Sequence, residues 1–129
     1  MVSSSLHIRR WILSVLLIAS FGIVTASAQN SVVVGVVMPT TGREAKPGLY
    51  QKEGIELAIK QINAKGGITV KGKKLQVKEV FYDDGSDSAK SASLCERVMS
   101  SDKATAVLGG YSTALGEAES VMPDRYKIP

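Results

Sequence analysis

After residue 30, short apolar runs alternate with longer amphipathic stretches. Val32–Met38 (VVVGVVM) is an unbroken apolar run, which is typical of a strand buried on both faces of a parallel sheet. From about Leu49 to Lys65 the period changes to 3.6, which predicts an amphipathic helix. Its apolar stripe consists of Ile55, Ala58, Ile59 and Ile62. Pro39 ends the strand, and Gly66-Gly67 ends the helix.

The alternation of strand and helix repeats twice more. Leu75–Tyr82 (LQVKEVFY) predicts a second strand, and Ala104–Leu108 (ATAVL) predicts a third. The helices that follow them are expected at about Ser88–Ser100, capped by Ser86 or Asp87, and from Ala114 to about Tyr126. The order β-α-β-α-β-α predicts an α/β fold with right-handed crossovers and a doubly wound parallel sheet.

A doubly wound sheet also predicts where a ligand binds, namely beyond the carboxyl ends of the strands at the switch point. With the second and third strands flanking the first, the loops Pro39–Gly48 and Gly109–Thr113 meet there. The second loop begins a helix, so its free backbone N–H groups and the hydroxyls of Ser112 and Thr113 can face an anion such as a carboxylate. A simpler interpretation is that one hydroxyl caps the helix, and we expect capping and ligand binding together.

The same turn comes close to a catalytic motif. Gly110-Tyr111-Ser112-Thr113-Ala114 differs from the nucleophile elbow G-x-S-x-G only in its last residue. A serine hydrolase also needs a histidine base, and the single histidine of this sequence is His7, in the N-terminal segment. We therefore expect no catalytic residues and no enzyme activity.

Metal, cofactor and thiol chemistry are not expected either. Asp83-x-Gly85-x-Asp87 resembles the start of a calcium loop, but Ser88 replaces the required glycine and Leu94 the required glutamate. No strand is followed by a glycine pattern for nucleotide phosphates. Cys95 lies on the apolar stripe of its helix, with Ala92, Val98 and Met99, and is expected to be a buried hydrophobe.

The N-terminal segment has the three parts of a secretory signal peptide. Residues 1–10 end in Arg9-Arg10, residues 11–25 carry no charge, and Ala26-Ser27-Ala28 supplies the small residues of a cleavage site after Ala28. The alternative is an uncleaved membrane anchor, for which the apolar run is short compared with a span of about 20 residues. We expect cleavage and export, which divides the sequence into residues 1–28 and 29–129.

Removal of the signal peptide changes the charge balance. The 129-residue chain carries a formal charge of +4. Residues 1–28 hold two arginines and no acid, so 14 basic and 12 acidic residues remain, a net charge of +2. The densest basic group (Lys71, Lys73, Lys74 and Lys78) is typical of a solvated turn and strand face. We expect no nucleic-acid partner.

Four segments resemble the start of the periplasmic branched-chain amino-acid-binding proteins, the Leu/Ile/Val-type receptors of ABC importers. They are VGVVMPTTG (34–42), GIELAIKQINAKGGI (54–68), FYDDGSD (81–87) and AVLGGYST (106–113). They occur in order and with matching spacing over nearly all of residues 32–129. The resemblance implies a lobe of the type 1 periplasmic binding protein fold, one of two that close on a ligand.

The resemblance also implies a function. A protein of this family is the periplasmic substrate-binding component of an ABC transporter, and it delivers branched-chain amino acids or related small amino-acid or amide ligands to a membrane permease. The alternative is the ligand-sensing ectodomain of a signalling receptor, which uses the same fold. The resemblance implies no cofactor.

Particular residues take on roles through the resemblance. It implies that Thr113, with Ser112 beside it and Tyr111 in the same turn, binds the α-carboxylate of the ligand. Members often place an aromatic residue before the glycine at Gly48 to cover the ligand side chain. Here Pro47 holds that position, so the resemblance does not single out leucine.

Family members run to roughly 350 residues, as two lobes of ordinary domain size require. We therefore expect residues 29–129 to form only the first three βα units of the first lobe, as a fragment. Because its sheet keeps an unpaired edge, we expect low stability and no tight ligand binding.

The signal-peptide hypothesis makes a direct prediction. We expect the exported protein to begin at Gln29, because signal peptidase reads the small residues Ala26 and Ala28. N-terminal sequencing or intact mass spectrometry of the secreted fraction measures this. A membrane-bound product that keeps residues 1–28 would instead support the anchor.

Overall fold

The computed structural model describes residues 31–129, so the predicted signal peptide and its cleavage after Ala28 lie outside the described residues. The elements, in chain order, are β1 (Ser31–Met38), α2 (Ala45–Ala64), β2 (Ile68–Val70), β3 (Lys73–Asp83), α3 (Ser88–Ser100), β4 (Ala106–Leu108) and α4 (Thr113–Tyr126). Within this part of the chain, no helix is both long enough and apolar enough to cross a membrane.

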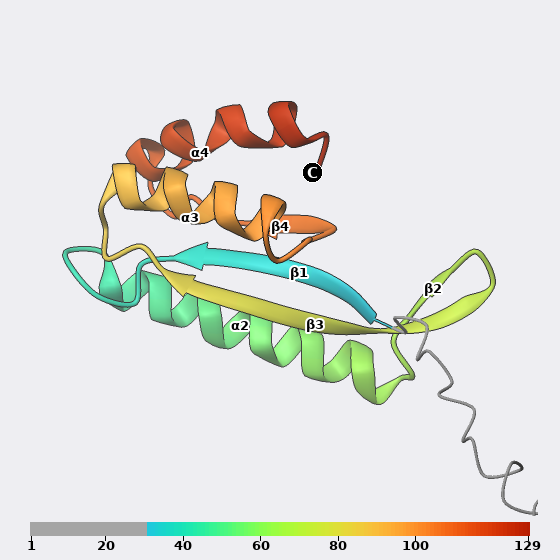
Figure 1. Cartoon of the computed structure of the whole chain (residues 1–129). Helices are drawn as coiled ribbons and strands as arrows, with labels where there is room; N and C mark the ends of the chain where they lie inside the picture. The colour runs from blue at the N-terminus through green and yellow to red at the C-terminus, as the bar shows by residue number, and fades with distance from the viewer. Residues whose placement is uncertain (1–30) are drawn as a thin grey trace, which may run out of the picture.

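The sheet has the order β2-β3-β1-β4, with β1 parallel to both β3 and β4. Helix α2 covers one face, α3 covers the other, and α4 packs on α3 (Figure 1). The predicted α/β class, and the prediction that the next two parallel strands flank the first, are confirmed. The switch point therefore lies between β1 and β4, because the chain leaves β1 for β3 on one side and later returns to its other side.

Strand β1 supplies the centre of the core. Val36 and Val37 are fully buried, and Val33 and Val37 pack with Val98 of α3 and with Ala104. Gly35 permits this approach, because a Cβ there would collide with the Val98 side chain. The unbroken apolar run is thus explained by helices on both faces of the strand.

The predicted start of the first helix was wrong by four residues. Helix α2 begins at Ala45, so Pro47 and Gly48 belong to its first turn and not to the preceding loop. Proline is tolerated there because the N–H groups of a first turn have no intrahelical acceptor. Gly48 is buried against the carbonyl group of Pro39, which leaves no room for a Cβ.

The sequence patterns missed strand β2. Ile68–Val70 pairs antiparallel with Lys73–Leu75 of β3 in a tight hairpin. The two turn residues, Lys71 and Gly72, have φ angles of 49° and 79°, which the two-residue turn of such a hairpin requires. Three residues, two of them exposed, are too few to show a strand period.

Beyond the hairpin, a side chain of α2 pairs with β3. The Asn63 amide donates to the Val77 carbonyl at 2.8 Å and accepts from the Val77 N–H at 2.8 Å. Asn63 thereby satisfies backbone groups of β3 where β2 no longer runs beside it. This contact gives the asparagine of the INAKGGI segment a structural role.

The apolar stripe of α2 faces the sheet without filling the space beside it. Ile55, Ile59 and Ile62 are half-buried, whereas Ala58 is exposed. An apolar groove of about 300 Å³ lies here, lined by Val32, Val34, Ile55, Ala58, Ile59, Ile62, Ile68, Val77 and Leu108. One face of β1 is therefore only partly covered in residues 31–129.

The contact between Gly48 and Pro39 can be tested against a matched glycine in the same helix. We expect Gly48→Ala to lower the free energy of unfolding, because the new Cβ must displace the Pro39 carbonyl. Gly54 has no atom within 4 Å of its Cβ position, so Gly54→Ala should raise the free energy of unfolding by about 1 kcal/mol. Chemical denaturation of both variants measures the two shifts, and shifts of the same sign would contradict this account of Gly48.

Candidate functional site

The carboxyl ends of the three parallel strands lie at one edge of the sheet. Met38 of β1 is in register with Asp83 of β3, and Val36 of β1 is in register with Leu108 of β4. The segments 39–44, 84–87 and 109–112 leave from this edge, each leading to the start of a helix (Figure 1). The two loops predicted to border the ligand, after β1 and after β4, therefore lie at the same edge.

A single carboxylate fixes the loop after β1. Asp83 Oδ1 accepts from the backbone N–H groups of Thr40 at 2.8 Å, Thr41 at 3.2 Å and Gly85 at 3.0 Å. The Thr41 hydroxyl donates to Asp83 Oδ2 at 2.6 Å. Partial burial acts to raise the pKa of Asp83, but the hydrogen bonds, led by that of the Thr41 hydroxyl, outweigh it and lower the pKa to about 2.

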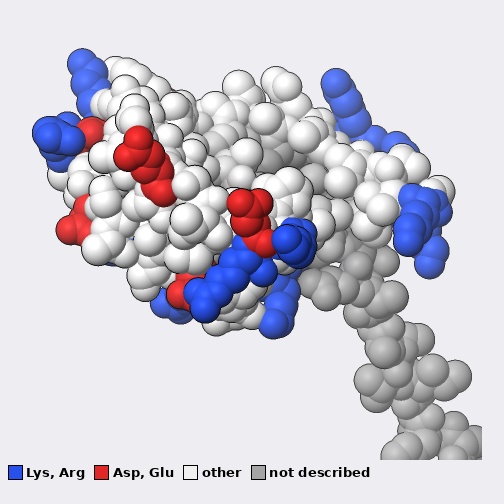
Figure 2. Space-filling model, turned by 90° about the horizontal axis from the view of Figure 1, so that it is seen from above, with Lys and Arg blue, Asp and Glu red and all other residues white. Residues whose placement is uncertain are grey.

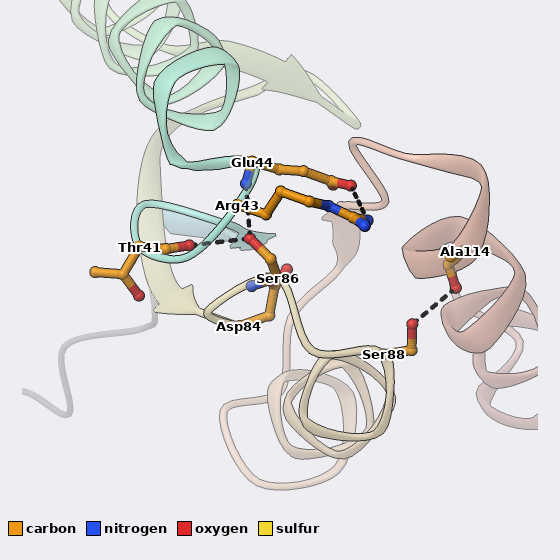
Figure 3. A network of polar contacts seen from close by, with 7 residues as sticks. All are labelled: Thr41, Arg43, Glu44, Asp84, Ser86, Ser88 and Ala114. Carbon is orange, nitrogen blue, oxygen red and sulfur yellow. Dashed lines mark hydrogen bonds and ion pairs between the residues drawn. The ribbon is translucent and has the colours of Figure 1, made fainter.

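Ser86 adds a second tie between the same two loops (Figure 3). Its hydroxyl donates to the Thr41 carbonyl at 3.0 Å and accepts from the Glu44 N–H at 3.0 Å. Farther along, the Ser88 hydroxyl donates to the Ala114 carbonyl at 3.3 Å and so joins the start of α3 to the start of α4. All three loops at the edge are thus linked through the β3–α3 segment.

The predicted cap of α3 is Asp87, and this is confirmed. Its side chain accepts from the Lys90 N–H at 2.7 Å. The prediction that the Asp83–Asp87 segment is entirely a loop was wrong at Asp83, which ends β3. Among residues 31–129 no group of three metal-ligating side chains occurs.

The turn before α4 places the predicted ligand-binding residues in different environments. Ser112 is the N-cap residue of α4 by position, yet its side chain makes no capping hydrogen bond. Of the two hydroxyls expected to cap the helix, that of Ser112 therefore does not, and Thr113 is already the first helical residue. Its Oγ is buried and has no hydrogen-bond partner among the described residues. Thr113, the first helical residue, is exposed, and Tyr111 is 39% exposed.

Sequence reasoning missed Glu44, which lies between the β1 loop and α2. Its Oε1 forms an ion pair with Arg43 at 3.0 Å, whereas its Oε2 is buried without a hydrogen-bond partner among residues 31–129 (Figure 3). No motif identifies it, because a glutamate before a helix is common and its burial depends on the fold. The edge therefore holds one free buried hydroxyl and one free buried carboxylate oxygen.

Pro47 and Gly48, predicted to lie in the loop after β1, belong to a helix instead. Pro47 and Gly48 lie in the first turn of α2, where Gly48 packs on Pro39.

The predicted burial of Cys95 is confirmed, since this residue is 1% exposed. Burial, and then the charge of Glu119, raise the pKa of its thiol to about 11, so it stays protonated.

Charged side chains are scattered on the face that carries α4. Seen from that side, Lys and Arg lie at separate places around the rim, with acidic residues among them and a broad uncharged area between (Figure 2). This face offers no continuous basic surface.

The family comparison matches nearly all of the described chain. A model of the family described as "Periplasmic binding protein" matches residues 31–127. The amino acid binding protein of Pseudomonas aeruginosa is 34% identical over 106 residues, which are 82% of this chain and 27% of that protein. The Leu/Ile/Val-binding protein homolog 3 of Brucella melitensis is 35% identical over 86 residues, 67% of this chain and 22% of that protein.

Solved structures of the same kind share the fold. LivJ, the branched-chain amino acid transporter substrate binding protein of Streptococcus pneumoniae, solved with isoleucine, matches with a TM-score of 0.71 and 28% identity, over 77% of this chain and 27% of that one. LivK, a leucine binding protein of Thermotoga maritima, matches with a TM-score of 0.64 and 28% identity, over 76% of this chain and 26% of that one. The chain thus spans about a quarter of the length of these proteins. They are solute-binding proteins and not enzymes, and they lend no support to a signalling receptor.

The Asp83 clamp predicts a pH-dependent contribution to stability. The folded state lowers the pKa of Asp83 from 3.8 to about 2, so its contribution is present above pH 4 and disappears as the pH falls toward 2. We expect Asp83→Asn to lower the free energy of unfolding by about 2 kcal/mol at pH 7.

The matched control is Asp124→Asn, at an exposed position of α4. Urea denaturation between pH 2 and pH 7 should show the deficit of Asp83→Asn shrinking toward acid pH, with little change for Asp124→Asn. A deficit that is the same at both ends of this range would rule out the carboxylate clamp.

Proposed function

Since the chain belongs to the periplasmic binding protein family, we propose that it supplies the ligand-binding edge of a first lobe in an exported, non-catalytic receptor for a small amino-acid-like ligand. The receptor serves an ABC importer in the periplasm. The chain covers about a quarter of its relatives' length. The proposed receptor therefore includes a second lobe and further binding groups that residues 31–129 do not supply.

The observation that carries the proposal is the free hydroxyl of Ser112. A buried hydroxyl without a partner costs about 1–3 kcal/mol, so such groups usually have a partner in the functional state. The hydroxyl lies at the N-terminus of the 14-residue helix α4, whose first N–H groups have no intrahelical acceptor. Both features favour an anionic ligand group at this turn, and the α-carboxylate of an amino acid fits.

The class of ligand is supported by the relatives. Two of them are named for binding amino acids or Leu/Ile/Val, and the S. pneumoniae structure contains isoleucine. We propose a branched-chain amino acid or a related small amino acid or amide. In this arrangement Ser112 and the N–H groups of the turn hold the carboxylate, and Thr113 and Tyr111 contact the ligand from the solvent side.

The mechanism we propose is capture followed by closure. The carboxylate binds first at the start of α4, where the hydrogen-bond donors are already fixed by the strands and helices around them. The second lobe then closes on the ligand by hinge motion, and the permease recognises the closed form. The signal peptide at residues 1–28 directs the protein to the periplasm.

The role of the turn can be tested with hydroxyl deletions. We expect Ser112→Ala to weaken binding of L-isoleucine by about 10-fold, because a hydrogen bond to a carboxylate is lost. Thr113→Ala should weaken it as well. Because residues 31–129 supply one side of the site, the affinity is low, and NMR titration with L-isoleucine is the suitable measurement.

Ser120→Ala is the matched control, since Ser120 is exposed on the same helix and its hydroxyl bonds only the Glu117 carbonyl. It should bind L-isoleucine as the unchanged chain does. Circular dichroism confirms that the variants remain folded. Unchanged affinity in both Ser112→Ala and Thr113→Ala would remove the turn from the binding site.

A further inference from the structure

Glu119 of α4 reaches back to the turn from which its own helix begins. It is 7% exposed, and its carboxylate lies against the backbone of Gly109 and Gly110. A Cβ at Gly109 would collide with Glu119 Oε2, and a Cβ at Gly110 would come within 2.7 Å of the Gly116 Cα. The two glycines are therefore needed because the turn lies directly on the Glu119 side chain and the first turn of α4.

On its other side, Glu119 meets a second buried acid through one serine. The Ser91 hydroxyl of α3 donates to Glu119 Oε1 and also lies 3.4 Å from Asp84 Oδ2. Asp84 and Ser91 are both fully buried. The other oxygen of Asp84, Oδ1, accepts from the Ser86 N–H at 2.7 Å. One hydroxyl proton cannot serve both acids at once, and two buried negative charges this close repel each other, so one of the acids holds a proton.

We propose that Glu119 is a positioning residue for ligand binding. Asp84 and Glu119 share one proton through the Ser91 hydroxyl, and this shared proton keeps the Gly109–Thr113 turn in the shape that binds the ligand. The role in binding rests on the proposed function, whereas the shared proton does not. Glu119 lies against Gly109 and Gly110, and Ser112 follows only two residues after Gly110.

The charges around the pair give the direction of its pH dependence. Burial is the largest effect at both sites, and it raises the pKa of Asp84 and of Glu119. The charge of Asp84 raises the pKa of Glu119 further, and the charge of Asp83 raises the pKa of Asp84. Glu119 faces Asp84 and, from α3, the protonated thiol of Cys95. Besides Asp83, Asp84 also lies near the charge of Lys90, which lowers its pKa. Because the folded state binds this proton more tightly, the support of the turn is present at low pH and is lost as the pH rises.

The experiment follows the Gly110 amide of the purified chain by ¹H–¹⁵N NMR between pH 4 and pH 9. We expect this resonance to titrate with a midpoint above that of an ordinary carboxyl, and to stop titrating in Glu119→Gln, which mimics the protonated acid. Glu117→Gln, at an exposed position of the same helix, should leave the titration unchanged.

Titration with L-isoleucine at pH 7 tests the effect on binding. Glu119→Gln should bind within about 2-fold of the unchanged chain, since its amide has the size of the carboxylate and can donate to the Ser91 hydroxyl. Glu119→Ala removes the partner of Ser91 and the side chain beneath Gly109 and Gly110, so it should bind about 10-fold more weakly. Rescue by glutamine, but not by alanine, separates positioning by hydrogen bonds from simple filling of space.

The outcomes distinguish this inference from the proposed function. A Gly110 resonance that titrates identically in the unchanged chain and in Glu119→Gln overturns the shared proton. Glu119→Ala binding as tightly as the unchanged chain overturns the positioning role. Absence of any L-isoleucine response in the unchanged chain counts against the proposed function, while the Gly110 titration still decides the shared proton.

Discussion

The structure depends on β1, which lies between helices on its two faces and pairs with a parallel strand along each edge. Every layer is placed relative to this strand: β3 and β4 pair with it, α3 packs over Gly35, and α2 lies on the opposite face. A strand with helices on both faces is apolar along its length, and a strand between two parallel neighbours brings three carboxyl ends to one edge. The position of the proposed binding edge is thus a consequence of how the core is formed.

Two adjacent aspartates at that edge have opposite environments, because successive side chains at the end of a strand point to opposite sides. Asp83 points to the β1 loop, where three hydrogen bonds from Thr40 and Thr41 stabilise its charge, and the Gly85 N–H adds a fourth. Asp84 points inward, where it lies beside Ser91 and Glu119 and its pKa is raised. The end of β3 therefore supports both loops of the site, one through a charged carboxylate and the other through a buried acid network.

The segments that carry the family resemblance have mostly structural roles in residues 31–129. Asn63 satisfies the open edge of β3, Asp83 fixes the β1 loop, and Gly109 makes room for Glu119. Ser112 is the exception, since its buried hydroxyl has no structural partner. The segments are therefore informative about the fold because they maintain it, and the proposed ligand contacts use the framework that they hold in place.

The sequence by itself determined the class of fold, the flanking of the first strand by the next two parallel strands, the bounds of α3 and its Asp87 cap, and the loops that lie together at the carboxyl edge of the sheet. These features depend on local periodicity, capping and chain connectivity, which short stretches of sequence encode. Only the tertiary structure decided that α2 begins at Ala45, that Ser112 does not cap its helix, and that Glu119 lies under the glycine turn. These features depend on contacts between residues far apart in the chain, such as Thr41 with Asp83 across 42 residues and Ser91 with Glu119 across 28. No local pattern records which polar group will find a partner there, because burial and hydrogen bonding are set by the elements packed around it.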